Sequence, residues 1–318
     1  MIDRRAAILH VLSWLAAPSI AATCIVAPSI ADAALPPPSP LPAPPGEAPA
    51  PKPEAAPIPT TAAAPAPLSH LEQTIEFLRL KEALAHEVPR LVTRTEAADA
   101  AWIALARAEL AGANTVLDRP QLLVVIDRNP RVQQLMVVLA SPQEDWRVVG
   151  GAKVSTGSTG RFDHYITPRG VFHVTTAILG YRAEGTLNEN GIRGLGSKGM
   201  RVWDFGWQVA AKGWDAGPGK PDRIPIRLMM HATDPDKLEA RIGRPASQGC
   251  VRIPTAMNRF LDLHGVLDSD YERAAATEIR FRALLLPERQ PSSLAGNTMV
   301  VVDSADKSSA TVASRTTP

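Results

Sequence analysis

The stretch "QLLVVIDRNPRVQQLMVVLAS", residues 121–141, contains two β-rich apolar runs separated by a tight turn at 128–131. Branched apolar side chains favour strands, and Asn with Pro favours the turn, so this stretch predicts a β-hairpin. Glycine-containing turns separate further runs of the same kind, at 146–158, 167–178, 224–231 and 277–286. We therefore predict a mostly β domain, a sandwich or open barrel with a few short helices, over residues 117–287.

Two helices are expected before this domain, as a helical hairpin at 69–116. Ser69 can cap the first helix, and Pro89 ends it. Apolar residues recur in this helix at near-helical spacing, at Leu71, Ile75, Leu78 and Leu84. Thr95 can open the second helix and Gly112 can close it. Packing against the β domain is the simplest role for the hairpin, and a docking element or a small accessory domain is the alternative.

The N-terminus has the layout of a secretory signal over residues 1–33. A short basic head, "MIDRR", precedes an apolar run, and "ADA" at Ala31–Ala33 fits a cleavage site. A transmembrane anchor is a poorer interpretation because Pro18 and Pro28 interrupt the run. Lipidation at Cys24 is a further alternative. We expect an exported protein of the periplasm or cell wall, with no transmembrane segment in the mature chain.

Two segments have compositions that do not favour a packed core. Residues 34–68 are rich in Pro and Ala and predict an extended linker. Residues 288–318 form a low-complexity tail rich in Ser, Thr and Ala, in which "TMVVVD", 298–303, could add an edge strand. The formal net charge is only +2, which argues against a dedicated nucleic-acid binder. No cluster of metal ligands is visible in the sequence, and we expect no metal and no cofactor.

Cleavage after residue 33 would leave Cys250 as the single cysteine, in "RPASQGCVRIP", 244–254. A lone thiol in an oxidising compartment is either buried and inert or used. A nucleophilic cysteine needs a base, donors for the oxyanion, and access. The amides of Gln248, Gly249 and Cys250 could supply the donors, and Arg252 could supply a fixed charge.

His231 is the candidate base, 19 residues before Cys250 at the end of an apolar strand. Asp234 can cap a short helix that Gly243 ends, and this excursion could return the chain to His231. The carbonyl of Ala232 could orient the imidazole. Three rival histidines are His164, His173 and His264, the last at an expected helix C-terminus. The alternative is an ordinary β-turn that holds a buried cysteine and an Arg ion pair.

The stretch "MHATDPDKLEARIGRPASQGCVRIP", 230–254, resembles the signature of the L,D-transpeptidase catalytic domain, the YkuD-like family. The stretch "VSTGSTGRFDHYITPRGVFHV", 154–174, is similar to an upstream block of that family, with matches at Thr167, Pro168, Gly170 and Phe172. The likeness covers roughly residues 119–287. One departure is Gln248, which stands where the family usually has His.

The resemblance implies a cysteine nucleophile at Cys250, a general base and acid at His231, and backbone oxyanion donors at Gly249 and Gln248. The implied substrate is a peptidoglycan stem peptide, and a β-lactam of the carbapenem class could form an adduct. Five residues are candidates for substrate binding: Arg252, Ser247, Trp203, Trp207 and Trp214. The alternative for the three tryptophans is that they close the core.

Several functions remain open at this point. The leading hypothesis is a cysteine-dependent transpeptidase that makes cross-links or attaches an amine through a thioester. With water as the acceptor, the protein would be an L,D-carboxypeptidase. A sortase-like transpeptidase also carries His, Cys and Arg in this order. Gln248 favours a third kind of protein, a non-catalytic wall-binding module that retains the fold.

Overall fold

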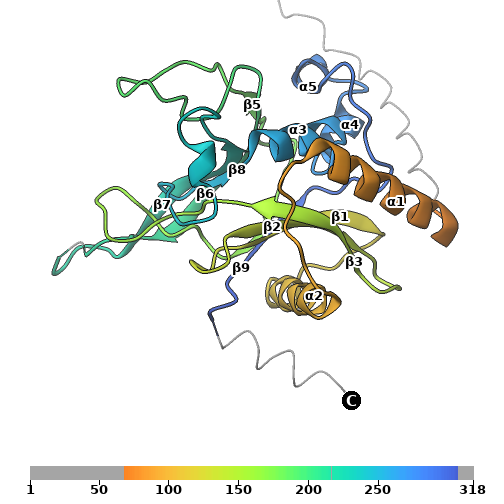
Figure 1. The fold of residues 1–318 in the computed structure, drawn as a ribbon, viewed down its shortest axis with the longest axis horizontal. Helices are drawn as coiled ribbons and strands as arrows, with labels where there is room; N and C mark the ends of the chain where they lie inside the picture. Colours follow the sequence, from red (N-terminus) through yellow and green to blue (C-terminus); the bar gives the residue numbers. More distant parts are fainter. Residues whose placement is uncertain (1–67, 216, 307–318) are drawn as a thin grey trace, which may run out of the picture. The chain divides into compact units, whose positions relative to one another are not determined.

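The computed structural model describes residues 68–215 and 217–306. Its five-stranded sheet has the order β3-β2-β1-β9-β4 (Figure 1). The strands of this sheet are β1 (Gln121–Asp127), β2 (Gln134–Ala140), β3 (Arg147–Lys153), β4 (Gly170–His173) and β9 (Thr298–Val302). β1 and β2 pair antiparallel, with Asp127 opposite Gln134, so the hairpin predicted at 121–141 is present. The mostly β prediction is confirmed.

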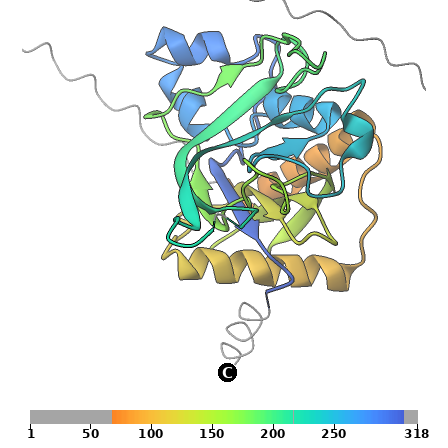
Figure 2. The same cartoon turned by 90° about the vertical axis from the view of Figure 1, so that its left-hand side faces the viewer.

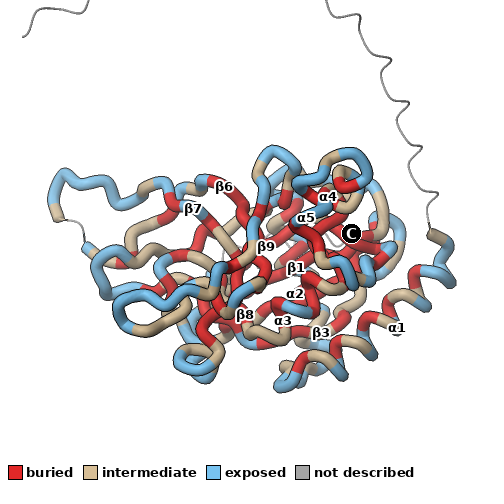
Figure 3. The backbone as a smooth tube through the Cα atoms, turned by 90° about the horizontal axis from the view of Figure 1, so that it is seen from above, coloured by how far each residue is buried: buried red, intermediate tan, exposed pale blue. Residues whose placement is uncertain are grey.

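Both faces of β1 are buried, and alternate residues belong to different apolar clusters. Leu122, Val124 and Ile126 join the main core, whereas Leu123 and Val125 join a second cluster on the opposite face. An uninterrupted apolar run is typical of a strand covered on both sides. Figure 3, in which buried residues are red, shows β1 and β9 as largely buried segments of the backbone.

β9 is an interior strand rather than the edge strand expected for 298–303. It pairs parallel with β1 and antiparallel with β4, and all of its residues are buried. The expectation of an edge was wrong because "TMVVV" has no polar face, which an exposed edge would require. The sheet therefore includes residues beyond Pro287, within the segment predicted as a tail.

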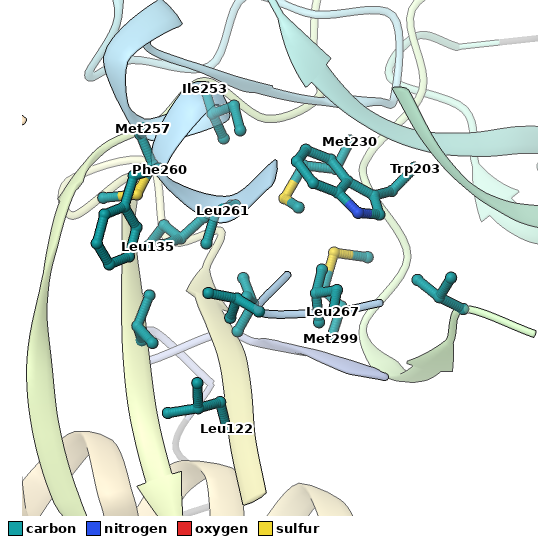
Figure 4. Close-up of a cluster of buried hydrophobic side chains, with 14 of the residues drawn as sticks. Leu122, Leu135, Trp203, Met230, Ile253, Met257, Phe260, Leu261, Leu267 and Met299 are labelled. Carbon is teal, nitrogen blue, oxygen red and sulfur yellow. The ribbon is translucent and has the colours of Figure 1, made fainter. Parts of the chain in front are cut away.

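The second sheet has the order β5-β6-β7-β8. Its strands are β5 (Tyr181–Arg182), β6 (Arg201–Ala211), β7 (Arg223–Ala232) and β8 (Val251–Ile253). β7 pairs antiparallel with β6 and parallel with β8. Side chains of β7 and β8 share the main core with β1 and β2, as Met230, Ile253, Leu122 and Leu135 show in Figure 4. This shared core fixes the sheet that carries His231.

The two leading helices lie on opposite sides of the five-stranded sheet (Figures 1 and 2). They are α1 (His70–Glu87) and α2 (Glu96–Gly112), capped by Ser69 and Thr95 as predicted. α1 buries Phe77, Leu80 and Leu84 in the main core. α2 buries its own apolar side chains, Trp102, Ala106 and Leu110, in the second cluster. Both helices thus pack against the β domain, which was the simplest expectation for the hairpin.

The buried face of α1 differs from the predicted one. Of the four residues in the predicted stripe only Leu84 is buried, and Leu71, Ile75 and Leu78 are 66%, 58% and 56% exposed. Phe77 and Leu80 complete the buried face with Leu84 at spacings of three and four. The sequence carries apolar residues on two faces of this helix, and spacing alone chose the wrong one.

Three short helices and one 3-10 turn complete the described chain. They are α3 (Thr255–Leu263), α4 (Ser269–Ala274), α5 (Ile279–Leu284) and η1 (Glu239–Arg241). The strand expected at 277–286 is wrong, since α5 occupies it. Phe281 and Leu284 are buried there while Ile279 is 72% exposed, which is a helical and not an alternating pattern.

The predicted signal segment, 1–33, lies outside the described residues, as does all of the predicted linker except Leu68. Among the helices of the described ranges, none has the length and apolar character needed to cross a membrane.

Candidate active site

His231 lies near the end of β7 and is buried, with 3% of its surface exposed. Its Nδ1 is 2.6 Å from the carbonyl oxygen of Ala232. Because a carbonyl oxygen only accepts, Nδ1 carries the hydrogen and Nε2 keeps its lone pair. Burial, together with the charge of Arg252, lowers the pKa of His231 to about 4, against the opposing effect of the Ala232 hydrogen bond. The ring is therefore a neutral base at pH 7.

The loop before Cys250 turns sharply at Gly249, which has a φ of +124°. This φ lies in the region that favours glycine, and a β-carbon here would also lie 2.6 Å from Cδ1 of Ile226, whose side chain would have to shift. The Ser247 hydroxyl accepts the Gly249 N–H at 3.1 Å and donates to the Cys250 carbonyl at 2.5 Å. The turn is thus held by its own serine.

Cys250 is the last residue before β8 and is half-buried. Its Sγ lies 3.7 Å from the carbonyl oxygen of Arg227 on β7. Burial raises the pKa of the Cys250 thiol, whereas the Met229 amide and the Arg252 charge act to lower it. The thiol is protonated in this environment at neutral pH.

The register of β7 and β8 places His231, Cys250 and Arg252 on the same face. His231 is opposite Arg252, and Met230 is opposite Val251 in the neighbouring row. Alternate residues along a strand share a face, so Cys250 lies on the face of Arg252 and His231. Met230 and Val251 lie on the opposite face. No hydrogen bond joins Sγ to the ring in the described structure. The charge of Arg252 nevertheless influences the pKa of both groups.

The three candidate oxyanion donors are not equivalent. The Gly249 amide is engaged by Ser247, as described above. The amides of Gln248 and Cys250 make no hydrogen bond to any described residue. The Gln248 side chain is exposed, and its Nε2 donates to Asp163 at 3.3 Å. Two backbone donors beside the thiol therefore remain free for a ligand.

The candidate site lies within a segment that matches a known protein family. Residues 123–268 match the sequence model of the L,D-transpeptidase catalytic domain, YkuD. This segment belongs to the L,D-transpeptidase catalytic domain family. The family acts on peptidoglycan. The matched segment contains His231, Cys250 and Arg252, whereas α1, α2 and β9 lie outside it.

No curated protein matches the chain. A solved structure with a similar chain is a fused Zn-dependent amidase/peptidase/peptidoglycan-binding domain-containing protein from Clostridium acetobutylicum ATCC 824. The identity is 12% and the TM-score 0.25, over 68% of this chain and 65% of that chain. The chain thus spans about two thirds of the length of that protein.

Trp203 does not line the candidate site. It is fully buried in the main core among Met230, Leu267 and Met299 (Figure 4). Its Nε1 donates to Asp268 at 3.3 Å, which satisfies its polar atom inside the protein. Trp203 points inward from β6 and lies between the two sheets, so it cannot contact a substrate. The prediction that Trp203 binds substrate was wrong.

The other predicted substrate-binding residues differ in their exposure. Ser247 is fully buried and its hydroxyl is used within the loop, so it shapes the turn instead of meeting a substrate. Trp207 is 67% exposed, and the Arg227 guanidinium lies 5.9 Å from its ring. Trp214 is half-buried and packs against Phe162 and Tyr165, with ring centroids 5.3 and 5.2 Å apart. The last two tryptophans remain candidates.

Thr167 connects the two matched motifs, 154–174 and 230–254, through a hydrogen bond. The sequence motifs did not assign it this role. Its buried hydroxyl accepts the Gly157 N–H at 2.9 Å and donates to the Gly249 carbonyl at 2.7 Å. The Thr-Pro block was recognised only as a family match. Its contact with residues 247–250, the cysteine loop, depends on tertiary packing, which the spacing of residues in the sequence does not reveal.

An ion pair beside the thiol was also missed. Asp204 on β6 is nearly buried and pairs with Arg227 Nη2 at 2.8 Å. Asp204 also accepts the Gly206 N–H at 2.8 Å, inside an irregularity of the β6–β7 pairing. Tyr181 on β5 donates its hydroxyl to the Met229 sulfur at 3.2 Å. The bulge shifts the register, so the sequence alone does not indicate that these side chains meet.

The rival histidines have other partners. His264, at the C-terminal end of α3, has its Nε2 2.9 Å from the carboxylate of Glu87, the last residue of α1. His173 Nδ1 lies 3.0 Å from the Thr298 hydroxyl. Within the ranges that the structure describes, no group of three His, Cys, Asp or Glu side chains could hold a metal ion.

Proposed function

We propose that the protein is a cysteine-dependent L,D-transpeptidase that acts on peptidoglycan stem peptides through a thioester acyl-enzyme. The observation that carries this proposal is the common face of His231, Cys250 and Arg252, with the imidazole tautomer held by Ala232. The family match supplies the class of substrate.

The acylation step begins from a neutral pair. A raised thiol pKa and a lowered imidazole pKa favour SH and neutral ring at rest. His231 Nε2 takes the thiol proton as Sγ attacks the carbonyl carbon of an L-to-D peptide link at a diamino-acid residue. The carbonyl π electrons move to oxygen, and the free amides of Gln248 and Cys250 donate to this oxyanion. The charge of Arg252 offsets the negative charge that develops.

Collapse of the tetrahedral intermediate breaks the C–N bond. The leaving amine, that of D-alanine, takes the proton from His231, and a thioester remains on Cys250. An amine from a second stem or from a protein then attacks the thioester carbonyl and gives its proton to His231. The new amide forms, and the thiol returns with that proton. Water in place of the amine would give the carboxypeptidase product.

Gln248 stands where the family usually has His, and this difference does not remove the backbone N–H that would donate to the oxyanion. Gln248 donates from its main chain whatever its side chain does, and its side-chain amide is bonded to Asp163. The non-catalytic alternative is less well supported because the base, the thiol and the free amides are all present.

Export belongs to the same proposal. The pattern of residues 1–33 supports secretion to the periplasm or cell wall, where stem peptides occur.

The deciding experiment treats purified wall fragments with the protein and analyses the products by mass spectrometry. Links between two diamino-acid residues indicate transfer, and loss of the terminal residue alone indicates hydrolysis. If neither product forms while wall fragments are retained on the protein, the binding-module alternative is correct.

A further inference from the structure

His164 contacts the cysteine loop at the carbonyl of Ser247. The proposed mechanism does not use this histidine. Its Nδ1 lies 2.7 Å from the Ser158 hydroxyl and 3.1 Å from the Ser247 carbonyl oxygen. Ser158 also donates its backbone N–H to the same carbonyl, at 3.2 Å. Ser158 and His164, from one short segment of the chain, therefore both contact the carbonyl oxygen of Ser247, which is distant from them in sequence.

The tautomer of His164 follows from these partners. The Ser247 carbonyl can only accept, so an attractive contact at 3.1 Å requires a hydrogen on Nδ1. The Ser158 oxygen can accept from the same hydrogen. Nδ1–H is thus shared between the Ser158 hydroxyl oxygen and the Ser247 carbonyl, and the Ser158 hydroxyl in turn donates to the same carbonyl at 3.4 Å.

Ser247 is restrained at both of its ends. Its carbonyl receives His164 and Ser158, while its hydroxyl bridges Gly249 and the Cys250 carbonyl. The residue is fully buried, so water cannot replace these partners. Any rotation of the Ser247 peptide would move the Gln248 amide, because the Ser247 carbonyl and the Gln248 N–H belong to one planar group.

We propose that His164 is a positioning residue whose Nδ1–H holds the Ser247–Gln248 peptide so that the Gln248 amide faces the oxyanion. This inference rests on the proposed function. In this chain, position 248 has no imidazole, and its Gln side chain points to Asp163, the neighbour of His164. The loop is therefore held through residues 163 and 164, from the segment before Thr167.

The test compares His164→Ala with His164→Asn in the full chain. Asn keeps a nitrogen donor close to the position of Nδ1, whereas Ala removes it. The reaction is covalent adduct formation with a carbapenem, and the readouts are the limiting rate and the concentration at half-maximal rate. Loss of one oxyanion donor lowers acyl-transfer rates about 100-fold or more, so a displaced donor should lower the limiting rate about 10-fold.

We expect this loss in His164→Ala, with the half-maximal concentration nearly unchanged, and recovery to within about threefold in His164→Asn. His86→Ala, at an exposed position of α1, is the matched control and should behave as wild type. Alkylation of Cys250 by iodoacetamide needs no oxyanion donor, so it should not change. Equal rates for Ala and wild type, or no recovery with Asn, would overturn the proposal.

A second readout does not depend on activity. The Gly249 amide is bonded to Ser247, so its hydrogen exchange reports how firmly the loop is held. We expect about 10-fold faster exchange in His164→Ala and near wild-type exchange in His164→Asn. If wild type forms no adduct, the proposed function fails, and unchanged Gly249 exchange separately refutes the positioning role.

Discussion

At the scale of single residues, the site combines a buried neutral imidazole with a half-buried thiol. The pKa of His231 is lowered and the pKa of Cys250 is raised, and burial is the largest cause of both shifts. Burial disfavours the charged form, and that form is the cation for His231 but the thiolate for Cys250. Proton transfer therefore has to accompany attack, and the two residues depend on each other.

Substitution of either residue should prevent acylation. A carbapenem carries a strained carbonyl whose opening leaves no departing group, so the adduct persists and is visible by intact mass. Cys250→Ala should give no adduct mapped to peptide 244–254, and His231→Ala should acylate about 100-fold or more slowly than wild type.

His86→Ala again serves as the matched histidine control. Cys24 is a second thiol in the full chain, so peptide mapping is needed to assign the adduct. An adduct on the 244–254 peptide of Cys250→Ala would contradict the role of the thiol.

The pH dependence of acylation should have an unusual acid limb. Reaction needs an unprotonated His231, and its pKa is lowered from 6.5 to about 4. The rate should therefore stay high as the pH falls through 6 and decline only near pH 4. Measurement of the acylation rate from pH 3.5 to 8 checks this, and a half-maximum near 6.5 would indicate an exposed base.

At the scale of elements, the cysteine loop is held by segments that precede β4. Thr167→Val removes a hydroxyl while it keeps the shape, and leaves the Gly157 N–H and Gly249 carbonyl without their partner. The loss of one buried and one partly buried hydrogen bond should lower the free energy of unfolding by about 1–3 kcal/mol.

Thr167→Ser is the matched control, since it keeps the hydroxyl and loses only a methyl group. Urea unfolding followed by tryptophan fluorescence compares the two variants. Acylation should fall with Val and be largely retained with Ser. Equal stability of the two variants would show that the hydroxyl does not support the loop.

The comparison of sequence with structure also differs by element. The β1–β2 hairpin, the caps at Ser69 and Thr95, and the Ala232 contact of His231 could be predicted because each depends on neighbours in sequence. The helix α5, the buried face of α1 and the place of β9 could not, because they depend on which surface is covered. In the candidate site, the motifs singled out Cys250, His231 and Thr167, but they did not indicate the contacts of Thr167, the ion pair of Asp204 or the burial of Trp203.

At the scale of the whole molecule, the described fold is completed by elements outside the family match. α1 and α2 each cover one face of the five-stranded sheet, and β9 separates β1 from β4. Without α2, one face of β1 and β2 would expose Leu123, Val125 and Met136. The two predicted helices therefore complete the two apolar clusters and form part of the same packed unit as the sheet.

The role of β9 can be tested by ending the chain after Pro287, the predicted limit of the domain. This truncation removes the only strand that joins β1 to β4 in the described sheet, and β4 leads back to the segment that holds Thr167. Burial of each large apolar side chain stabilises by about 1.5–3 kcal/mol, so the loss of Met299 to Val302, together with the strand pairing, is comparable to the whole stability of a typical domain. We expect a protein without a cooperative thermal transition and without acylation. A chain ended after Asp306 keeps β9 and the Asp303 pair with Arg128, and should melt cooperatively near the wild-type temperature. If the shorter chain also melted cooperatively and formed the adduct, residues 117–287 with the leading helices would suffice, and β9 would be dispensable to the site.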